Sequence, residues 1–393
     1  MRVLMVHNTY RGPGGEDVVA RHEADLLRDN GHEVLEWWRS NAEFKGATGL
    51  LRAPAHAVWA LDTRRALRQM IADFRPQVMH IHNFWMAVSP SAHRFAKAAG
   101  IAVVQTLHNF RLLCCNGLLF RDGAPCERCL TKRFAYPGVV LRCYRRSAAQ
   151  SLLVAGTMAL HRAAGTWDDS VDAYIALTEF AKGKFVAGGL PADKIVVKPN
   201  FIHPDPGVRA SPGDYAISVG RLSGEKGLMT MLRAWTALGD IPLRIVGDGP
   251  LMADVQACIA QHGLTGVETL GYRPPEQTLD LIKGARFLIF PSECYESFPM
   301  TILEAFACGV PVIASRRGSM SEIVHDGQTG LLFAAGEASD LAQCASHAWT
   351  NPHLLARIAA KARAAYEAHY SAPANYPALI AVYERALARV KRS

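Results

Sequence analysis

The 393-residue sequence lacks several features that would place it in other classes of protein. No apolar run reaches the roughly 18 residues that a transmembrane helix needs, and the apolar start of the chain is too short for a signal peptide. The sequence contains no internal repeat and no low-complexity segment. These absences argue against a helical membrane protein, a solenoid and a disordered chain. We therefore expect a globular, cytoplasmic protein of two domains.

Cysteine and positive charge, by contrast, are plentiful. Nine cysteines in a cytoplasmic protein argue against disulfides and leave metal binding or plain buried thiols. Lys and Arg number 43 against 35 Asp and Glu, which gives a formal net charge of +8. That balance suits an acidic partner, such as a nucleoside diphosphate, an anionic lipid surface or a nucleic acid.

The first half of the sequence alternates short apolar runs with amphipathic segments, which predicts a parallel α/β domain. An expected strand at residues 3–6 leads through the loop 11–15 into an expected helix at 16–28. Glycines at a helix N-terminus, here Gly14 and Gly15, either receive an anion or simply form a tight turn. The spacing is not G-x-G-x-x-G, so a dinucleotide site is not supported.

Two further expected strands of this half end in polar residues. His82 and Asn83 follow one of them, and His108 and Asn109 follow the other. Open α/β sheets bind ligands at the carboxyl ends of their strands, so these side chains are candidate site residues. A lone histidine is nevertheless more often structural than functional.

Five cysteines cluster within thirty residues of the first half. Cys126 and Cys129 have the two-residue spacing of a metal knuckle. Cys143 and Cys115, or its neighbour Cys114, would complete four thiolates for a structural zinc ion. The alternative is a set of buried thiols without metal. The spacing is not that of a ferredoxin, which disfavours an iron–sulfur cluster.

Basic residues recur in two segments of the same half. Residues 50–71 are expected to form one amphipathic helix, which either rests on anionic lipid or is an ordinary surface helix. Residues 121–146 combine basic and aromatic side chains, which suits a lipid pyrophosphate, a membrane surface or a nucleic acid. The basic positions are Arg52, Arg64, Arg65, Arg68, Arg121, Arg128, Lys132, Arg133, Arg142, Arg145 and Arg146.

A stretch rich in Pro and Gly, residues 199–213, predicts a linker, after which the α/β pattern restarts. The next expected strand runs into the turn Gly-Arg-Leu-Ser-Gly-Glu-Lys-Gly, which opens a helix. Arg221 and Lys226, five residues apart in this turn, provide the charges that a diphosphate needs. The alternative is a solvated turn.

The most informative stretch is residues 293–315, between two expected buried strands. Glu296 lies in a polar loop, and Pro299 stands where a helix can begin. Glu304 interrupts the apolar helix expected at 301–308. A carboxylate there is costly without a partner, and the two hydroxyls of a ribose are a suitable one. The alternative is one exposed and one helix-capping glutamate.

These motifs resemble those of the retaining glycosyltransferases of family 4, which have the GT-B fold of two Rossmann-like domains facing across a cleft. The resemblance rests on Glu296-x7-Glu304 followed by Ala-x-Ala-x-Gly-x-Pro-Val, on the turn at 220–227, and on Thr-x-His-Asn at 106–109. It implies an acceptor-binding domain at 1–206, a nucleotide-sugar-binding domain at 207–374, and a helix at 375–393 that returns to the first domain. The chain departs from the family in having Ser297, Phe298 and Pro299 where a glycine is usual.

The resemblance also implies roles for individual residues. Arg221 and Lys226 would stabilise the leaving diphosphate, Glu304 would hold the ribose, and Glu296 would contact the donor sugar. His108 would assist near the transferred sugar. Gly14, Gly15, Arg273, Ser297, Phe298 and Pro299 complete the expected donor site, and His82, Asn83 and Asn109 the acceptor side.

The expected function is transfer of a sugar, with retention, from a UDP- or GDP-sugar to a glycan or lipid-linked acceptor in cell-surface polysaccharide synthesis. No D-x-D motif stands at a strand end, so we expect no catalytic metal. The enzyme would work in the cytoplasm or peripherally on the inner face of the plasma membrane. One alternative is a GT-B scaffold that binds nucleotide sugars without turnover. The other, a nucleic-acid-binding protein, is not what we expect.

Overall fold

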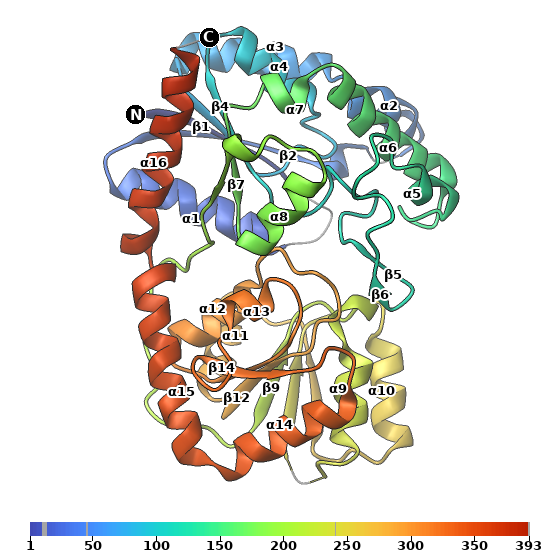
Figure 1. Ribbon diagram of the computed structural model, residues 1–393, viewed down its shortest axis with the longest axis vertical. Helices are drawn as coiled ribbons and strands as arrows, with labels where there is room; N and C mark the ends of the chain where they lie inside the picture. The colour runs from blue at the N-terminus through green and yellow to red at the C-terminus, as the bar shows by residue number, and fades with distance from the viewer. Residues whose placement is uncertain (10–13, 45, 240, 392–393) are drawn as a thin grey trace. The chain divides into compact units, whose positions relative to one another are not determined.

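The computed structural model describes residues 1–9, 14–44, 46–239 and 241–391 (Figure 1). The chain forms two compact units. The first unit contains residues 1–119, 127–200 and 375–393, and the second contains 120–126 and 201–374.

The first unit is built on a six-stranded sheet with the order β2-β1-β3-β4-β7-β8, in which every pairing is parallel. The central strands are buried along their whole length, as is typical of a parallel sheet, although β3 contains His80 and β4 contains Gln105 and Thr106. The strands are β1 (Arg2–Thr9), β2 (Glu33–Ser40), β3 (Val78–Ile81), β4 (Ala102–Thr106), β7 (Ala173–Ala176) and β8 (Ile195–Val197).

Helices accompany this sheet along the chain, and α16, late in the sequence, joins the same unit. The helices are α1 (Gly15–Asp29), α2 (Gly46–Val58), α3 (Leu61–Phe74), α4 (Ser91–Ala98), α5 (Tyr136–Val140), α6 (Ala148–Ala163), α7 (Thr166–Asp169), α8 (Glu179–Ala187) and α16 (Ala372–Val390).

The expectation of one helix over residues 50–71 is wrong, because the structure has two helices there, α2 and α3. Ala60 separates them with extended backbone angles, φ −92° and ψ 102°. Its N–H donates to Ser91 Oγ at 3.2 Å instead of to a carbonyl one turn back. A side-chain acceptor from α4 therefore ends α2, which the local periodicity could not indicate.

The second unit contains another six-stranded parallel sheet, with the order β11-β10-β9-β12-β13-β14. Counted within the unit this is 3-2-1-4-5-6, the Rossmann order. Its strands are β9 (Ala216–Val219), β10 (Leu243–Val246), β11 (Val267–Gly271), β12 (Phe287–Phe290), β13 (Val312–Ser315) and β14 (Gly330–Phe333). Its helices are α9 (Leu228–Trp235), α10 (Met252–Gln261), α11 (Pro275–Lys283), α12 (Met300–Ala307), α13 (Met320–Ile323), α14 (Ala338–Thr350) and α15 (Pro352–Ala365).

A short antiparallel hairpin, β5 (Phe120–Arg121) and β6 (Ala124–Pro125), also belongs to the second unit. Its segment ends at Cys126, so the proposed knuckle of Cys126 and Cys129 is divided between the two units. Arg121 was expected in the acceptor-side domain, and it too lies in this segment.

In each sheet, successive strands are added toward one edge up to a certain strand, and the later strands are then added toward the other edge. This switch point lies between β1 and β3 in the first unit and between β9 and β12 in the second. Open α/β sheets bind ligands outside the carboxyl ends of the two strands at such a point. The loops that leave these four strands are therefore the places to look for a site.

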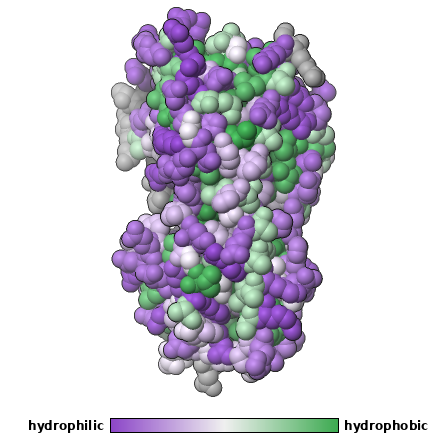
Figure 2. All heavy atoms as spheres, turned by 90° about the vertical axis from the view of Figure 1, so that its left-hand side faces the viewer, coloured by the Kyte–Doolittle hydropathy of each residue, from purple (hydrophilic) through white to green (hydrophobic). Residues whose placement is uncertain are grey.

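The surface gives no sign of a membrane span. Among the described residues, no helix combines the length and apolar character needed to cross a bilayer. Figure 2 shows one face of the molecule, on which hydrophobic and hydrophilic side chains are interspersed.

Candidate active site

At the switch point of the second unit, loops approach one another so closely that only glycine fits. Gly227 has a φ of +68°, and a Cβ there would lie 1.9 Å from the carbonyl oxygen of Pro291. A Cβ on Gly247, φ +139°, would lie 1.8 Å from the carbonyl oxygen of Gly220. Backbone packing thus requires glycine at Gly227, in the turn before α9, and at Gly247, in the turn after β10.

Lys226 and Glu296 form an ion pair at this point. Lys226 Nζ lies 2.6 Å from Glu296 Oε1, which also accepts a hydrogen bond from Ser292 Oγ at 2.6 Å. Burial alone would lower the pKa of Lys226, but Glu296 outweighs it and raises the pKa to about 12. Burial likewise opposes the ionised form of Glu296, and Lys226 brings the pKa of that carboxyl below its ordinary value. Both groups are therefore charged at neutral pH.

Further bonds hold the two loops together. The Glu293 N–H donates to the carbonyl of Glu225 at 2.9 Å, and Thr230 Oγ1 donates to Glu293 Oε1 at 2.6 Å. The Lys226 ammonium is consequently fixed by its own turn and by the loop after β12. Catalysis that relies on fixed charge requires such rigid placement.

Glu304 differs from Glu296 in having no ion-pair or hydrogen-bond partner within the part of the chain that the structure describes. Its carboxylate accepts no hydrogen bond from any described residue, and it is not sealed off from solvent. Burial raises its pKa to about 7. A half-buried carboxyl without a protein partner is available to a ligand's hydroxyl groups.

Backbone amides of the same loop are also available. The N–H groups of Ser297 and Phe298 donate to no described residue. Pro299 is the N-cap of α12, which begins at Met300, so Pro299 is one residue earlier than the helix-start position expected from the sequence. Pro299 has no N–H to donate, so the donors that this loop offers to a ligand are the amides of Ser297 and Phe298. Arg221 and Arg273 are exposed, and the Arg221 side chain makes no hydrogen bond or ion pair with the described residues.

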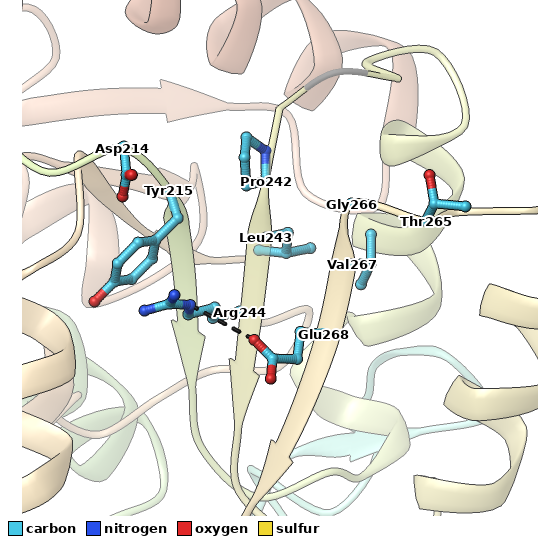
Figure 3. A pocket seen from close by; sticks show the side chains of 9 residues that line it. All are labelled: Asp214, Tyr215, Pro242, Leu243, Arg244, Thr265, Gly266, Val267 and Glu268. Carbon is cyan, nitrogen blue, oxygen red and sulfur yellow. Dashed lines mark ion pairs between the residues drawn. The ribbon is translucent and has the colours of Figure 1, made fainter.

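A pocket of about 410 Å³ lies elsewhere in this unit (Figure 3). Arg244 points toward Glu268 across it, at 3.6 Å. Its lining residues precede β9, β10 and β11 or occupy their first positions, so it lies at the amino ends of the strands. The candidate donor site is at the opposite edge of the sheet. The lining residues are Asp214, Tyr215, Pro242, Leu243, Arg244, Thr265, Gly266, Val267 and Glu268.

At the switch point of the first unit, amides and a carboxyl group meet. Asn83 Nδ2 donates to the carbonyl of Asn8 at 2.7 Å and to Glu16 Oε1 at 3.0 Å. Asn109 also hydrogen-bonds to Glu16, and its Oδ1 accepts from the Arg111 N–H at 3.0 Å. Burial, reinforced by the nearby Asp17, raises the pKa of Glu16 to about 8. The structure thus brings the predicted Asn83 and Asn109 together around a residue that was not predicted.

The two predicted histidines of this unit also meet. His82 Nδ1 lies 2.9 Å from His108 Nε2. His82 is buried, whereas His108 is half-buried. Burial, together with the neighbouring His82, lowers the pKa of His108 well below its ordinary value, so His108 is neutral at pH 7.

Gly14 and Gly15 open α1, as expected. Gly14 is the N-cap, and its N–H donates to Asp17 Oδ2 at 2.9 Å. That amide is thus used within the protein. The rest of the expected glycine loop, residues 11–13, lies outside the described residues.

Three of the clustered cysteines lie around Gly138. A Cβ there would lie 2.6 Å from Cys115 Sγ and 3.5 Å from Cys129 Sγ, and the Cys143 N–H donates to the Gly138 carbonyl at 2.9 Å. Cys114 Sγ instead contacts Asn116 Oδ1 at 2.9 Å. Of the two neighbours, Cys115 therefore joins the group.

Sequence reasoning missed Glu16, Glu23 and Lys198. Glu16 directly follows the glycine loop, and a carboxylate in the first turn of a helix has an ordinary explanation in the helix dipole. Glu23 is on the buried face of α1, and Lys198 directly follows β8. The one available signal was a charged residue at a position that the apolar period assigns to the core.

Comparisons with known proteins agree with this geometry. Residues 14–200 match the glycosyl transferase 4-like domain, and residues 204–365 match the family described as glycosyl transferases group 1. An amylovoran biosynthesis glycosyltransferase of Erwinia amylovora is 27% identical over 217 residues, which are 51% of this chain and 53% of that protein. The chain spans 37%, 21% and 53% of the lengths of the first three curated relatives.

Solved structures resemble the whole chain. A glycosyltransferase from Rickettsia africae has a TM-score of 0.72 at 15% identity, over 98% of this chain and 99% of that one. The Anabaena protein HepE, solved with UDP and glucose, has a TM-score of 0.66 at 18% identity, over 97% and 98% of the two chains. The two halves thus match glycosyltransferase domains, and the chain has the GT-B fold.

Proposed function

We propose that the chain is a retaining glycosyltransferase that moves a sugar from a nucleoside diphosphate sugar to a glycan or lipid-linked acceptor in cell-surface polysaccharide synthesis. The observation that carries the proposal is the pairing of a fixed Lys226 with Glu296, in the same unit as a carboxyl group, Glu304, that has no hydrogen-bond partner among the described residues. The relatives support it, because one acts in amylovoran biosynthesis and a structural neighbour was solved with UDP and glucose.

In this proposal each group of the second unit has one task. Lys226 and the exposed Arg221 neutralise the diphosphate as it leaves, so that fixed positive charge does the work without a catalytic metal. The unpartnered Glu304 accepts hydrogen bonds from the ribose hydroxyls. Glu296 and the open amides of Ser297 and Phe298 hold the donor sugar.

The first unit would supply the acceptor side. Asn83, Asn109 and Glu16 offer amide and carboxyl groups suited to sugar hydroxyls. His108 would act near the transferred sugar. No nucleophile stands out at the donor site, because Glu296 is already paired, so same-face substitution through an oxocarbenium-like state is the proposed route.

Two measurements test the proposal. A thermal-shift panel of UDP-, GDP- and ADP-sugars identifies the donor, because a bound ligand raises the melting temperature by mass action. Transfer to an acceptor, followed by NMR of the anomeric proton, then gives the stereochemistry. Binding without turnover would support the scaffold alternative, and an inverted product would exclude retention. A purified protein that carries nucleic acid, judged by its absorbance ratio, would favour the remaining alternative.

We also propose that the enzyme works at an anionic membrane surface. A groove of about 830 Å³ in the first unit is lined by Trp59, Leu67 and Ile71 together with Arg64 and Arg68. Apolar side chains beside cations suit lipid chains beside anionic headgroups. Other cations of this groove are already engaged, as its Lys97 is by Asp172.

The membrane proposal predicts salt-sensitive binding to anionic liposomes and weak binding to neutral ones. Each basic side chain near such a surface contributes about 1 kcal/mol, so reversing Arg64 and Arg68 to Glu should lower binding at least about tenfold. Arg357→Glu with Lys361→Glu, which changes the charge equally on exposed positions of α15, is the matched control. Equal co-sedimentation with both lipid types would refute the proposal.

A further inference from the structure

Beneath His108 the first unit contains a buried polar network that the proposed function does not use. It is centred on Glu23, which is fully buried on α1. Glu23 Oε1 lies 2.6 Å from Lys198 Nζ, and its Oε2 lies 3.3 Å from His82 Nε2 and 3.5 Å from His80 Nδ1. His82 in turn contacts His108 through Nδ1, at 2.9 Å.

Glu23, His80 and His82 bring three possible metal ligands within 4.8 Å of one another. Two observations argue against a metal there. Both ring nitrogens of His80 already have partners, Tyr383 Oη at 2.9 Å and Thr106 Oγ1 at 2.7 Å. Lys198 also brings a fully buried positive charge to the same carboxylate, which would repel a cation.

The network instead determines where protons reside. Burial opposes the ionised form of Glu23, but the Lys198 ammonium brings the pKa of Glu23 well below its ordinary value. An ionised carboxylate can only accept hydrogen bonds. The Glu23–Lys198 pair is neutral as a whole, so a positive charge on the buried His82 would have no counter-ion left.

We propose that Glu23 is a positioning residue that sets the tautomer of His108 through His82. Glu23 Oε2 and His82 Nε2 are buried 3.3 Å apart and have no hydrogen-bond partner among the described residues, so a proton on Nε2 of neutral His82 faces the carboxylate. The Nδ1 of His82 then accepts a hydrogen bond from His108 Nε2–H. His108, neutral as well, is left with an unprotonated Nδ1. That atom bonds to no described residue and is not closed off from solvent, so it faces a ligand as an acceptor.

The consequence for specificity rests on the proposed function. An acceptor nitrogen at His108 can take a hydrogen bond from a sugar hydroxyl, but it cannot donate one to a ring oxygen or a carbonyl. The residue that decides this, Glu23, contacts neither His108 nor solvent.

The first test needs no catalysis. The full chain is labelled with 15N at histidine, and long-range 1H–15N correlation spectra are recorded at pH 7.5, with His108 assigned by its loss in His108→Gln. We expect His108 protonated at Nε2 and bare at Nδ1, and His82 protonated at Nε2. A proton on His108 Nδ1, or a doubly protonated His82, would overturn the proposal. Absence of transferase activity alongside the expected spectrum would count against the proposed function only.

The second test is Glu23→Gln, which keeps the shape but replaces the acceptor with an amide that can donate to His82. We expect the His108 proton to move toward Nδ1, and kcat to fall about tenfold with the donor KM within about twofold. Asp25→Asn, which removes an exposed carboxylate from the same helix, is the control and should change neither. A folded Glu23→Gln with an unchanged His108 tautomer would contradict the proposal. If the variant does not fold, the wild-type spectrum still decides.

Discussion

The carboxyl edge of the second sheet carries charged side chains near solvent, whereas that of the first carries histidines and amides that are largely enclosed. In the second unit, Lys226 and Glu296 are 70 residues apart in the sequence, but each belongs to a recognisable local motif. In the first unit, His108 depends on Glu23, His82 and Lys198, which no local motif connects. A site of fixed charge on glycine turns can be recognised from short segments of sequence, whereas a buried network becomes visible only in the fold.

The largest effect is expected from removing the charge that defines the second unit's site. Lys226→Ala should lower kcat/KM at least about tenfold, about 1.4 kcal/mol of transition-state stabilisation. It also leaves the buried Glu296 carboxylate without its counter-ion. Lys361→Ala, at an exposed position of α15, should be neutral. EDTA should not change the activity, and an absolute Mg²⁺ requirement for the chemical step would contradict a site based on fixed charge.

A smaller effect should separate the two glutamates. Glu304→Gln should weaken binding of the free nucleoside diphosphate about fivefold, about 1 kcal/mol, because the ribose loses an ionised acceptor. Glu296→Gln should leave that affinity within about twofold and lower turnover, because the sugar is the only part of the donor assigned to Glu296 and Lys226 keeps its own charge for the diphosphate. Calorimetry with the free nucleotide separates the cases. Equal losses of affinity would show that the division of roles is wrong.

The pH dependence sharpens this distinction. The pKa of Glu304 is raised to about 7, so its carboxylate is mostly protonated at pH 6 and mostly ionised at pH 8. The ionised form is the better acceptor, and nucleotide binding should therefore tighten as the pH rises through about 7. The nucleotide's own phosphate titrates near this range, so the relevant quantity is the difference between wild type and Glu304→Gln. A difference that does not vary with pH would contradict the assignment.

A further prediction concerns the stability of the first unit. The pKa of Glu16 is raised to about 8, so ionisation favours the unfolded chain, whose glutamates titrate near their ordinary value of 4.5. The wild-type protein should therefore lose stability as the pH rises from about 4.5 toward 8. The glutamine of Glu16→Gln does not titrate. As the pH rises over this range, the melting temperature of the variant minus that of the wild type should increase by about 2–4 °C for each kcal/mol of stability that the wild type loses. Glu33→Gln, at an exposed position, should show no such trend.

Removal of a metal ion from the clustered cysteines should have the smallest effect on donor binding. We predict one equivalent of zinc, held by Cys115, Cys126, Cys129 and Cys143, in protein purified without added metal. Elemental analysis measures it, and removing the metal should leave nucleotide affinity within about twofold, because the cysteines fix a loop rather than the donor site. If zinc and iron are both well below one equivalent per chain, the zinc prediction is wrong and the cysteines are ordinary thiols.

Sequence alone predicted the GT-B fold, and for physical reasons it predicted the two halves unequally. The strands of the second unit read as short apolar runs bounded by glycine turns, and β12, for example, was expected at its observed position, Phe287–Phe290. The break between α2 and α3 was missed because the acceptor that ends α2, Ser91, is thirty residues away in sequence. Helix periodicity contains no information about such a partner.

The candidate site shows the same limit. The structure places Lys226 and Glu296 in contact, which their spacing alone did not require. Glu16 was not singled out, because its partners Asn83 and Asn109 come from other strands. Buried polar groups owe their properties to long-range neighbours, and those neighbours are what a single sequence conceals.

One contact of the first unit bears on how the chain is synthesised. Lys198 Nζ lies 2.9 Å from Asn375 Oδ1, and His80 Nδ1 contacts Tyr383 Oη, so the buried network includes side chains of α16. The strands of that sheet leave the ribosome long before α16 does. At roughly 5–20 residues per second, the nearly two hundred intervening residues impose a wait of roughly 10–40 s. The contact of Lys198 with Asn375 therefore forms only after α16 has been made, and the half of the protein made first is completed last.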